Sequence, residues 1–155
     1  MIGNIVCSFF GTLAFSILFN VPKRYYICCG LTGMAGWLCY CGVVESTSMT
    51  VATFLGTTIV VLMSRILAVW MKCPITIFLV SGIFPLVPGA GVYYTAYYLV
   101  TGDLGLAAIK GIGAVKIAFA IVLGIVFIVS IPKRWFRITY WKKRSLLNEQ
   151  EKQKS

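Results

Sequence analysis

The sequence contains no histidine, and only four of its 155 residues are acidic. Two of these acids, Glu149 and Glu151, lie near the C-terminal end, so Asp103 is the only acid between Glu45 and Glu149. Hydrolytic and group-transfer enzymes usually need a positioned general base or a metal ion. The inventory is too small for such chemistry, so we expect that the protein is not an enzyme.

Metal-binding patterns are missing as well, although the chain contains six cysteines. There is no Cys-x-x-Cys motif, and Cys28 and Cys39 lie about 16 Å apart along a helix, so the two cysteine pairs of this segment cannot converge. All six fall in or at the ends of apolar segments: Cys7, Cys28, Cys29, Cys39, Cys41 and Cys73. We expect small packing residues, with a redox or zinc role as the alternative, and neither a metal nor another cofactor.

Charge is also scarce, because 12% of the residues are charged and 59% are apolar, with a mean hydropathy of +0.91. This balance lies outside that of soluble domains. A bilayer core of about 30 Å needs roughly 20 mainly apolar residues per helix, and such runs occur at residues 2–21, 26–44, 50–71, 75–101 and 107–131. We therefore predict an all-α polytopic membrane protein with about five transmembrane helices. Residues 1–132 form one bundle, and residues 133–155 form a basic cytoplasmic tail.

The distribution of charged residues predicts the orientation of the chain. Lys23 and Arg24 follow the first apolar run instead of preceding it, which argues against a cleaved signal peptide and for a retained first helix. Lys72 marks the connection after the third run, whereas Glu45 and Asp103 mark the connections after the second and fourth. Since basic connections lie inside, we expect an outer N-terminus and a cytoplasmic C-terminus.

The tail mixes lysine and arginine with Trp135, Phe136, Tyr140 and Trp141. On a soluble protein this mixture would indicate nucleic-acid binding, because bases stack on aromatic rings and basic side chains neutralise phosphates. Here the tail directly follows the fifth apolar run. We therefore expect an aromatic belt at the lipid headgroups with basic side chains held by anionic lipids, and no nucleic acid.

The third apolar run carries a polar face and an arginine. Thr50, Thr53, Thr57 and Ser64 fall within an arc of about 60° on a regular helix. Such hydroxyl groups either let helices pack closely or line a polar path. Arg65 near the inner end of the run either faces a cavity or partner or extends to the inner interface.

The fifth apolar run contains two lysines. Lys116 lies deep in the run, where the sequence offers no nearby acid, so either a second subunit supplies a carboxylate or Lys116 faces water or substrate. Lys110 lies near the predicted outer end. If the helix begins later than the apolar pattern indicates, Lys110 belongs to the outer loop.

Helix-breaking residues interrupt the fourth apolar run, in the stretch SGIFPLVPGAGVYYTAYY at residues 81–98. Pro85 and Pro88 remove backbone donors, and Gly89 and Gly91 allow backbone conformations that other residues resist. We predict two half-helices, at about residues 75–84 and 91–101, with a break near the membrane midplane. Such breaks must be buried in protein or line a wet cavity, and they indicate transporter binding sites. A simple packing kink is the alternative.

The two half-helices predict the chemistry of a ligand. The free N–H groups that begin the second half-helix suit a carboxylate, and the unpaired carbonyls that end the first suit an ammonium group or a cation. Tyr93, Tyr94, Tyr97 and Tyr98 form either a hydroxyl-rich wall beside the break or a tyrosine belt at the outer interface. The candidate substrate-binding residues are Pro85, Pro88, Gly89, Gly91, Tyr93 and Tyr94, with Arg65 and Lys116 as further candidates.

With these residues in view, the chain resembles the small membrane subunit of the split threonine/serine exporter family, which is similar to the C-terminal half of the single-chain members. The resemblance covers roughly residues 1–135 and rests on FGTLAFSILFNVPKR, on the arginine-bearing third run leading into KCPITIF, and above all on FPLVPGAGVYYTAYYLVTGD. It implies export of threonine and serine, or of a dicarboxylate such as succinate, across the bacterial inner membrane. It also implies a complex with a larger membrane subunit of the same family.

Two functional hypotheses follow. In the first, the chain is an exporter subunit that contributes the broken helix to a site for a small carboxylate or amino acid. About five helices are few for a complete secondary transporter, so chain length also predicts a partner. In the second, the chain is a noncatalytic membrane scaffold that stabilises a larger partner.

Overall fold

The computed structural model describes residues 2–131, and within them every regular element is helical. The predicted all-α fold is thus confirmed, whereas the tail at 133–155 and its proposed lipid contacts lie outside the described residues. In chain order the elements are α1 (Ile2–Leu18), η1 (Lys23–Tyr25), α2 (Tyr26–Val44), α3 (Met49–Met71), α4 (Thr76–Ile83), η2 (Phe84–Leu86), α5 (Gly89–Val100) and α6 (Leu104–Val129).

The helices match the predicted apolar runs closely. Lys23–Val44, α3 and α6 are each long and apolar enough to cross a membrane, and Thr76–Leu86 with Gly89–Val100 forms a pair bent by 52° that makes up a fourth candidate if it is one broken span and not a re-entrant loop. Helix α1 is equally apolar, but its 17 residues extend only about 25 Å. The predicted number of about five spans is therefore reached only when the short helix α1 is added to these four candidates.

Helix α6 begins earlier than expected because Asp103 caps it. The Asp103 carboxylate accepts a hydrogen bond of 3.0 Å from the Leu106 N–H, which satisfies one of the free donors of the first turn. The helix therefore starts at Leu104, and the alternative that Lys110 lies in the outer loop is wrong.

Glycine seams bring α1, α2 and α3 into close contact. A Cβ atom added at Gly36 of α2 would lie 2.3 Å from Val60 Cγ2 and 3.4 Å from the Gly56 carbonyl oxygen of α3. At Gly33, an added Cβ would lie 2.0 Å from Thr12 Oγ1 of α1. Only glycine allows backbones to approach this closely, as in other membrane helix pairs.

The hydroxyl face of α3 is buried and bonded within its own helix. Thr53, Thr57 and Ser64 are at most 2% exposed. Each donates to the carbonyl four residues earlier, at 2.7–2.8 Å. These hydroxyl groups therefore serve helix packing, which is the first of the two interpretations that the sequence allowed.

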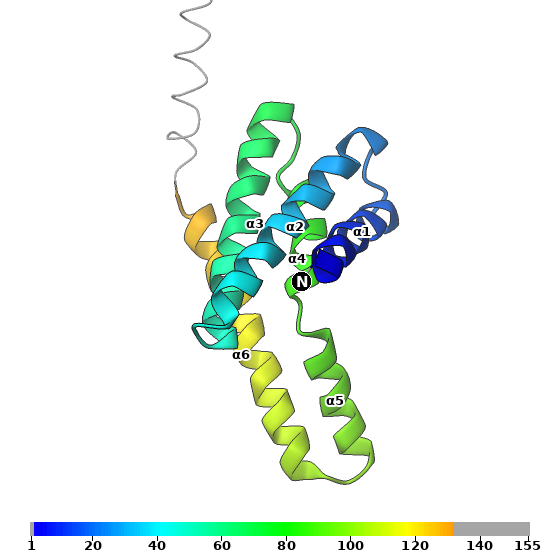
Figure 1. Cartoon of the computed structure of the whole chain (residues 1–155), viewed down its shortest axis with the longest axis vertical. Coiled ribbons are helices and arrows are strands. Elements are labelled where there is room, and N and C mark those ends of the chain that lie inside the picture. The colour runs from blue at the N-terminus through cyan, green and yellow to red at the C-terminus, as the bar shows by residue number, and fades with distance from the viewer. Residues whose placement is uncertain (1, 132–155) are drawn as a thin grey trace, which may run out of the picture.

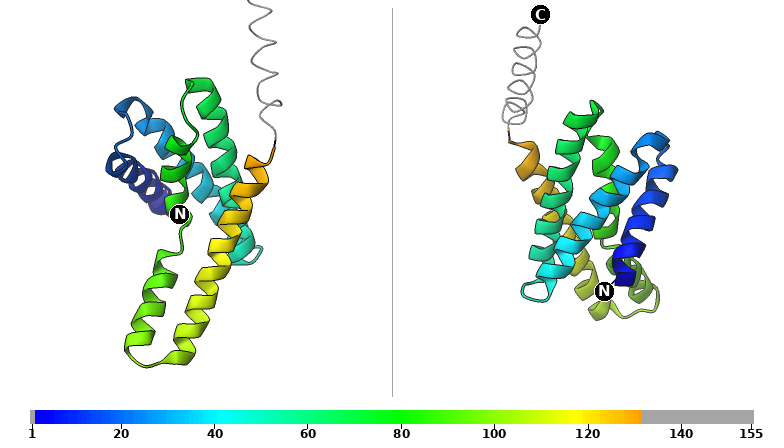
Figure 2. Two further views of the ribbon diagram at one scale, coloured as in Figure 1. Left: turned by 180° about the vertical axis from the view of Figure 1, so that it is seen from behind. Right: turned by 45° about the horizontal axis from the view of Figure 1, so that its top comes forward.

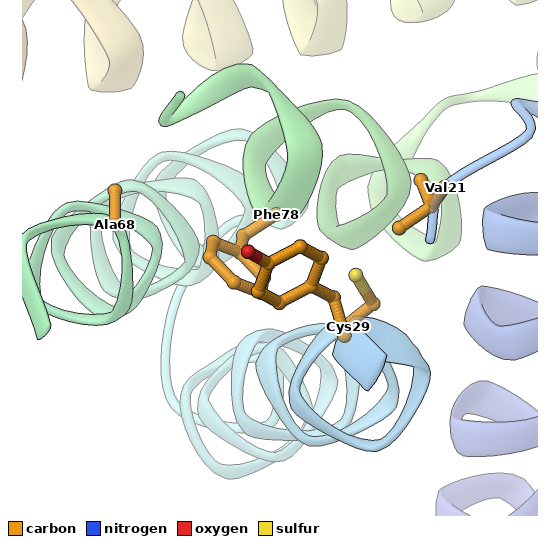
Figure 3. Close-up of a cluster of buried hydrophobic side chains, with 5 residues drawn as sticks. Val21, Cys29, Ala68 and Phe78 are labelled. Carbon is orange, nitrogen blue, oxygen red and sulfur yellow. The ribbon is translucent and has the colours of Figure 1, made fainter. Parts of the chain in front are cut away.

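An apolar cluster holds the first half of the broken span in the bundle. Val21, Tyr25, Cys29, Ala68 and Phe78 are all buried, and Figure 3 shows Phe78 among the helices, with Ala68 on one side of it and Cys29 on the other. The Tyr25 and Phe78 rings meet edge to face, with centroids 5.7 Å apart. Helix α4 is thus fixed by residues from the α1–α2 connection, α2 and α3.

The ends of the helices separate basic from acidic connections. In Figure 1, the α1–α2 and α3–α4 connections lie at one end of the bundle, and the C-terminal end of α6 points the same way. The α2–α3 and α5–α6 connections lie at the other end. The first group carries Lys23, Arg24 and Lys72, and the second carries Glu45 and Asp103. Figure 2 shows a further feature: α5 and the first half of α6 form a hairpin that projects beyond the α2–α3 turn.

Candidate functional site

The break in the fourth span results from its two prolines. Helix α4 passes into the 3-10 turn η2 with Pro85 near its start, and Val87 is extended (φ −66°, ψ 133°) before Pro88. Within the break, the Val87 N–H donates to the Phe84 carbonyl at 3.2 Å and the Gly89 N–H donates to the Val87 carbonyl at 2.8 Å. The predicted break is confirmed, although the half-helices are Thr76–Ile83 and Gly89–Val100.

The two glycines after the break have different surroundings. A Cβ atom added at Gly89 would meet nothing within 4 Å, whereas one at Gly91 would lie 3.2 Å from Ala114 Cβ of α6. Gly91 therefore allows α5 and α6 to pack closely. Among residues 2–131, the N–H groups of Ala90 and Gly91 have no acceptor, so the first turn of α5 presents free donors, as expected at a helix N-terminus.

A cavity of about 280 Å³ lies beside the break, between η2, α1 and α2. This volume is at the lower end of the range for ligand sites, so it suits a small metabolite. Its lining comes from one face of α1, one residue of α2 and the start of η2: Asn4, Cys7, Ser8, Gly11, Phe15, Trp37, Phe84 and Pro85.

The cavity lining combines aromatic rings with hydrogen-bond donors. The Phe15 and Phe84 rings stack with centroids 3.7 Å apart. The indole N–H of Trp37 is buried and has no acceptor within the described chain, which leaves a polar group unsatisfied in an apolar setting. Ser8 is buried, and its hydroxyl makes only a long contact of 3.4 Å to the Gly33 carbonyl. Within the part of the chain that the structure describes, no acidic residue lines the cavity.

The candidate tyrosines lie on α5, outside this cavity. Tyr93 and Tyr94 are 63% and 46% exposed, and α5 has no buried residue. Tyr93 stacks on Tyr97 and Tyr94 stacks on Tyr98, with centroids 6.5 and 6.4 Å apart. The four rings therefore pack on one another along the helix and leave their outer sides open.

Arg65 lies at the end of the bundle where α3 and α6 terminate, opposite the α5–α6 hairpin. Its side chain is only 7% exposed, and its guanidinium donates to the carbonyls of Ile128 and Ile131 at the C-terminal end of α6. Because Gly91 contacts Ala114, Arg65 lies roughly 20 Å along α6 from the break. The structure thus does not bring Arg65 together with the prolines and glycines.

Lys116 lies closer to the break but points elsewhere. Its side chain is exposed, and it lines one hollow with residues of α5 and another with residues of α3. Neither hollow includes Pro85 or another residue of the break. Among the described residues, no group of three or more His, Cys, Asp and Glu side chains is placed to hold a metal.

Sequence reasoning missed the residues of α1 and α2 that line the cavity. Asn4, Ser8, Gly11 and Phe15 recur every three or four residues, and Cys7 lies three after Asn4 and four before Gly11, which places all five on one helical face. This stripe of small and polar residues was the available signal. Trp37 carries no comparable signal, because its unpaired N–H becomes evident only in the packed structure.

The fold and the site define a multi-pass α-helical membrane protein with a broken span beside a small cavity, a class that includes secondary transporters. The chain belongs to the family described as Threonine/Serine exporter, ThrE, which it matches over residues 4–131. The resemblance of its motifs to this family is thereby confirmed, and the protein is a threonine/serine exporter-type transporter, not a member of an enzyme family. Comparisons with curated proteins and with solved structures give no match.

Proposed function

We propose that the chain is one subunit of a secondary transporter that exports threonine or serine, or a dicarboxylate such as succinate, across the bacterial inner membrane. The observation that carries this proposal is the cavity beside the break, whose lining includes Trp37, and the buried indole N–H of this residue has no acceptor within residues 2–131. The partner is a larger membrane subunit of the same family. Membership of the exporter family supports export as the transport activity.

The substrate carboxylate is bound by N–H groups. The Trp37 indole is one donor, and the first turn of α5 at Ala90 and Gly91 supplies others with a favourable helix dipole. Pro85 and Pro88 create the break, and the space around Gly89 lets a substrate approach it. Movement of α5 about the break would bring its donors toward the cavity and expose them in turn to either side of the membrane.

The ammonium group of an amino-acid substrate would be bound by a backbone carbonyl and aromatic rings, without a protein carboxylate. Because Pro85 has no N–H, the Ser81 carbonyl four residues earlier lacks the donor that an α-helix would supply. Ser81 does not line the cavity itself, where the aromatic rings of Phe15, Phe84 and Trp37 offer cation–π contacts. Tyr93 and Tyr94 flank the exit along α5, where exposed hydroxyl groups would replace part of the hydration of a departing substrate.

The charges at the two ends of the bundle support an orientation of the protein in the membrane. Its basic connections lie at one end and its acidic connections at the other, which favours an outer N-terminus and a cytoplasmic C-terminus. The basic tail at residues 133–155 then lies where anionic lipids are available.

The test measures efflux from cells preloaded with threonine or with succinate, comparing this chain, the larger subunit, and both together. We expect efflux of one substrate only when both chains are present. Trp37→Phe keeps an aromatic side chain, with a phenyl ring in place of the larger indole, but removes the N–H, so the half-saturating substrate concentration should rise about tenfold or more, because hydrogen bonds to charged groups contribute about 1.5–3 kcal/mol.

Trp70→Phe is the matched control, since Trp70 on α3 is 76% exposed and far from the cavity lining. Its efflux should equal that of the unmodified pair. If Trp37→Phe behaves like Trp70→Phe, the cavity is not the substrate site. If both chains assemble but move neither substrate, the scaffold hypothesis replaces this proposal.

A further inference from the structure

Lys116 occupies the middle of the most apolar span of the protein. Helix α6 has 26 residues and contains an 18-residue window with a mean hydropathy of 2.7, and Lys116 lies about as far from Leu104 as from Val129. Its side chain is exposed, and within residues 2–131 it forms no hydrogen bond or ion pair. Ionisable residues in such segments are costly and normally face a partner or a cavity.

The surface around Lys116 is grooved. A hollow of about 450 Å³ lies on its α5 side, with Thr95 and Leu99 in its wall. A second hollow of about 340 Å³ lies on its α3 side, with Thr50 and Phe54 in its wall. Lys116 lines both, so the two hollows lie on either side of this residue and together make a grooved surface along α6.

The exposed residues along this groove have the spacing of a helix-packing seam. We define the α6 stripe as Ile109, Ile112, Lys116, Phe119 and Leu123. Successive members are three or four residues apart, as in the seams of packed helix pairs. The four apolar members are 58–67% exposed, so the seam has no counterpart within the described chain.

The α5–α6 hairpin cannot be matched to the same bilayer as the rest of the bundle. Lys116 shares a hollow with Thr50 in the first turn of α3, so the α6 residues before it extend roughly 18 Å beyond α3. Figures 1 and 2 show the hairpin projecting past the α2–α3 turn. A bilayer centred on α3 leaves this apolar hairpin outside the lipid, and one centred on α6 places Lys116 in hydrocarbon. A protein partner relieves either mismatch.

Charge identifies the kind of partner. A second copy related by a two-fold axis would place the α6 stripe against itself, so that one Lys116 would face the other. Asp103 cannot pair with Lys116, because it lies about 20 Å away along the helix and already caps α6. Glu45 lines neither hollow. We infer that the α6 stripe binds a transmembrane helix of a different protein, and that this helix carries a carboxylate opposite Lys116.

The larger exporter-family subunit is the probe, a choice that depends on the proposed function. The full chain is co-expressed with it, carrying a photo-crosslinking amino acid at Ile112 or Phe119. Val122 is the matched control, because it is on the same helix and 53% exposed but points about 60° away from Phe119 and roughly 80–140° away from the other stripe residues. We expect crosslinks to the larger subunit from Ile112 and Phe119 that are at least about tenfold stronger than from Val122.

Substitution of the lysines tests the charge. Lys116→Met should reduce the recovered complex about tenfold or more, because the partner carboxylate loses its counter-charge, whereas Lys110→Met, an exposed lysine of the same helix, should not. Restoration of the complex when Lys116→Glu is combined with a carboxylate-to-lysine change in the larger subunit would identify the pair.

Three results would overturn the inference. Crosslinks between two copies of this chain would show a self-association face, and equal signals from Phe119 and Val122 would show a lipid-facing surface. A Lys116→Met complex that assembles normally but loses efflux would place Lys116 on the substrate path. Crosslinking and recovery need no transport, so they test the interface even if the unmodified pair exports neither threonine nor succinate.

Discussion

Arg65 shows at the scale of one residue how a charged side chain is accommodated within this bundle. The last carbonyls of a helix have no donors of their own and carry the negative end of the helix dipole. The buried guanidinium of Arg65 on α3 supplies donors to the Ile128 carbonyl in the last turn of α6 and to the Ile131 carbonyl just after the helix. Its place in the fold is therefore to fix α6 on α3, and hence to hold the root of the α5–α6 hairpin.

Removal of this side chain should destabilise the protein. Arg65→Ala leaves carbonyls of α6 without their charged donors, and we expect a loss of about 2–4 kcal/mol of folding free energy. Arg65→Lys should retain part of the stability, since an ammonium group keeps the charge but not the planar fork. Thermal unfolding of the purified protein in detergent measures both. A stable Arg65→Ala protein that fails to export would instead put Arg65 back among the substrate-binding candidates.

Two glycines of α2 make a second prediction, because only one of them faces a helix. Gly36→Ala drives a methyl group into Val60 and should cost about 1–3 kcal/mol through overpacking. Gly42→Ala meets nothing within 4 Å and should be neutral or stabilise α2 by about 0.5–1 kcal/mol. Unfolding midpoints of the two variants should therefore move in opposite directions. A shared decrease would mean that Gly42 also faces a close neighbour.

At the scale of elements, apolar run length and the residues Pro85 and Pro88 were sufficient to predict the helices and the break. These features act locally, through the thickness of a bilayer and the missing N–H of proline. The cavity was not predictable in the same way, because Ser8, Trp37 and Phe84 come from three helices and meet only after packing. The contact of Arg65 with Ile128 likewise joins residues 63 positions apart, and no sequence pattern encodes it.

The bend itself is open to a direct test. Changing both Pro85 and Pro88 to alanine restores two N–H donors and removes a penalty of about 3 kcal/mol for each proline in a helix interior. We expect a straighter span, normal membrane insertion and a loss of efflux of at least about tenfold. Pro74→Ala in the exposed α3–α4 connection is the control and should export normally. Full efflux by the double variant would assign the prolines a packing role only.

At the scale of the whole molecule, the separation of charged connections predicts which face of the bundle lies outside the cell. The test uses single exposed cysteines in the α2–α3 turn (Ser46→Cys) and at the end of α3 (Lys72→Cys). A membrane-impermeant maleimide added to intact cells should label position 46 and not position 72, because connections rich in Lys and Arg remain on the cytoplasmic side.

The native thiols set the background of this experiment. Burial raises the pKa of the Cys73 thiol, so less of it is thiolate at neutral pH and it reacts slowly. Its labelling should increase as the pH rises, so the reporter variants also carry Cys73→Ser. Among the other native cysteines, the buried Cys29 is kept and the rest are replaced. After permeabilisation both reporter positions should be labelled. Labelling of position 72 alone in intact cells would show that the protein has the opposite orientation. The α5–α6 hairpin would then project toward the cytoplasm.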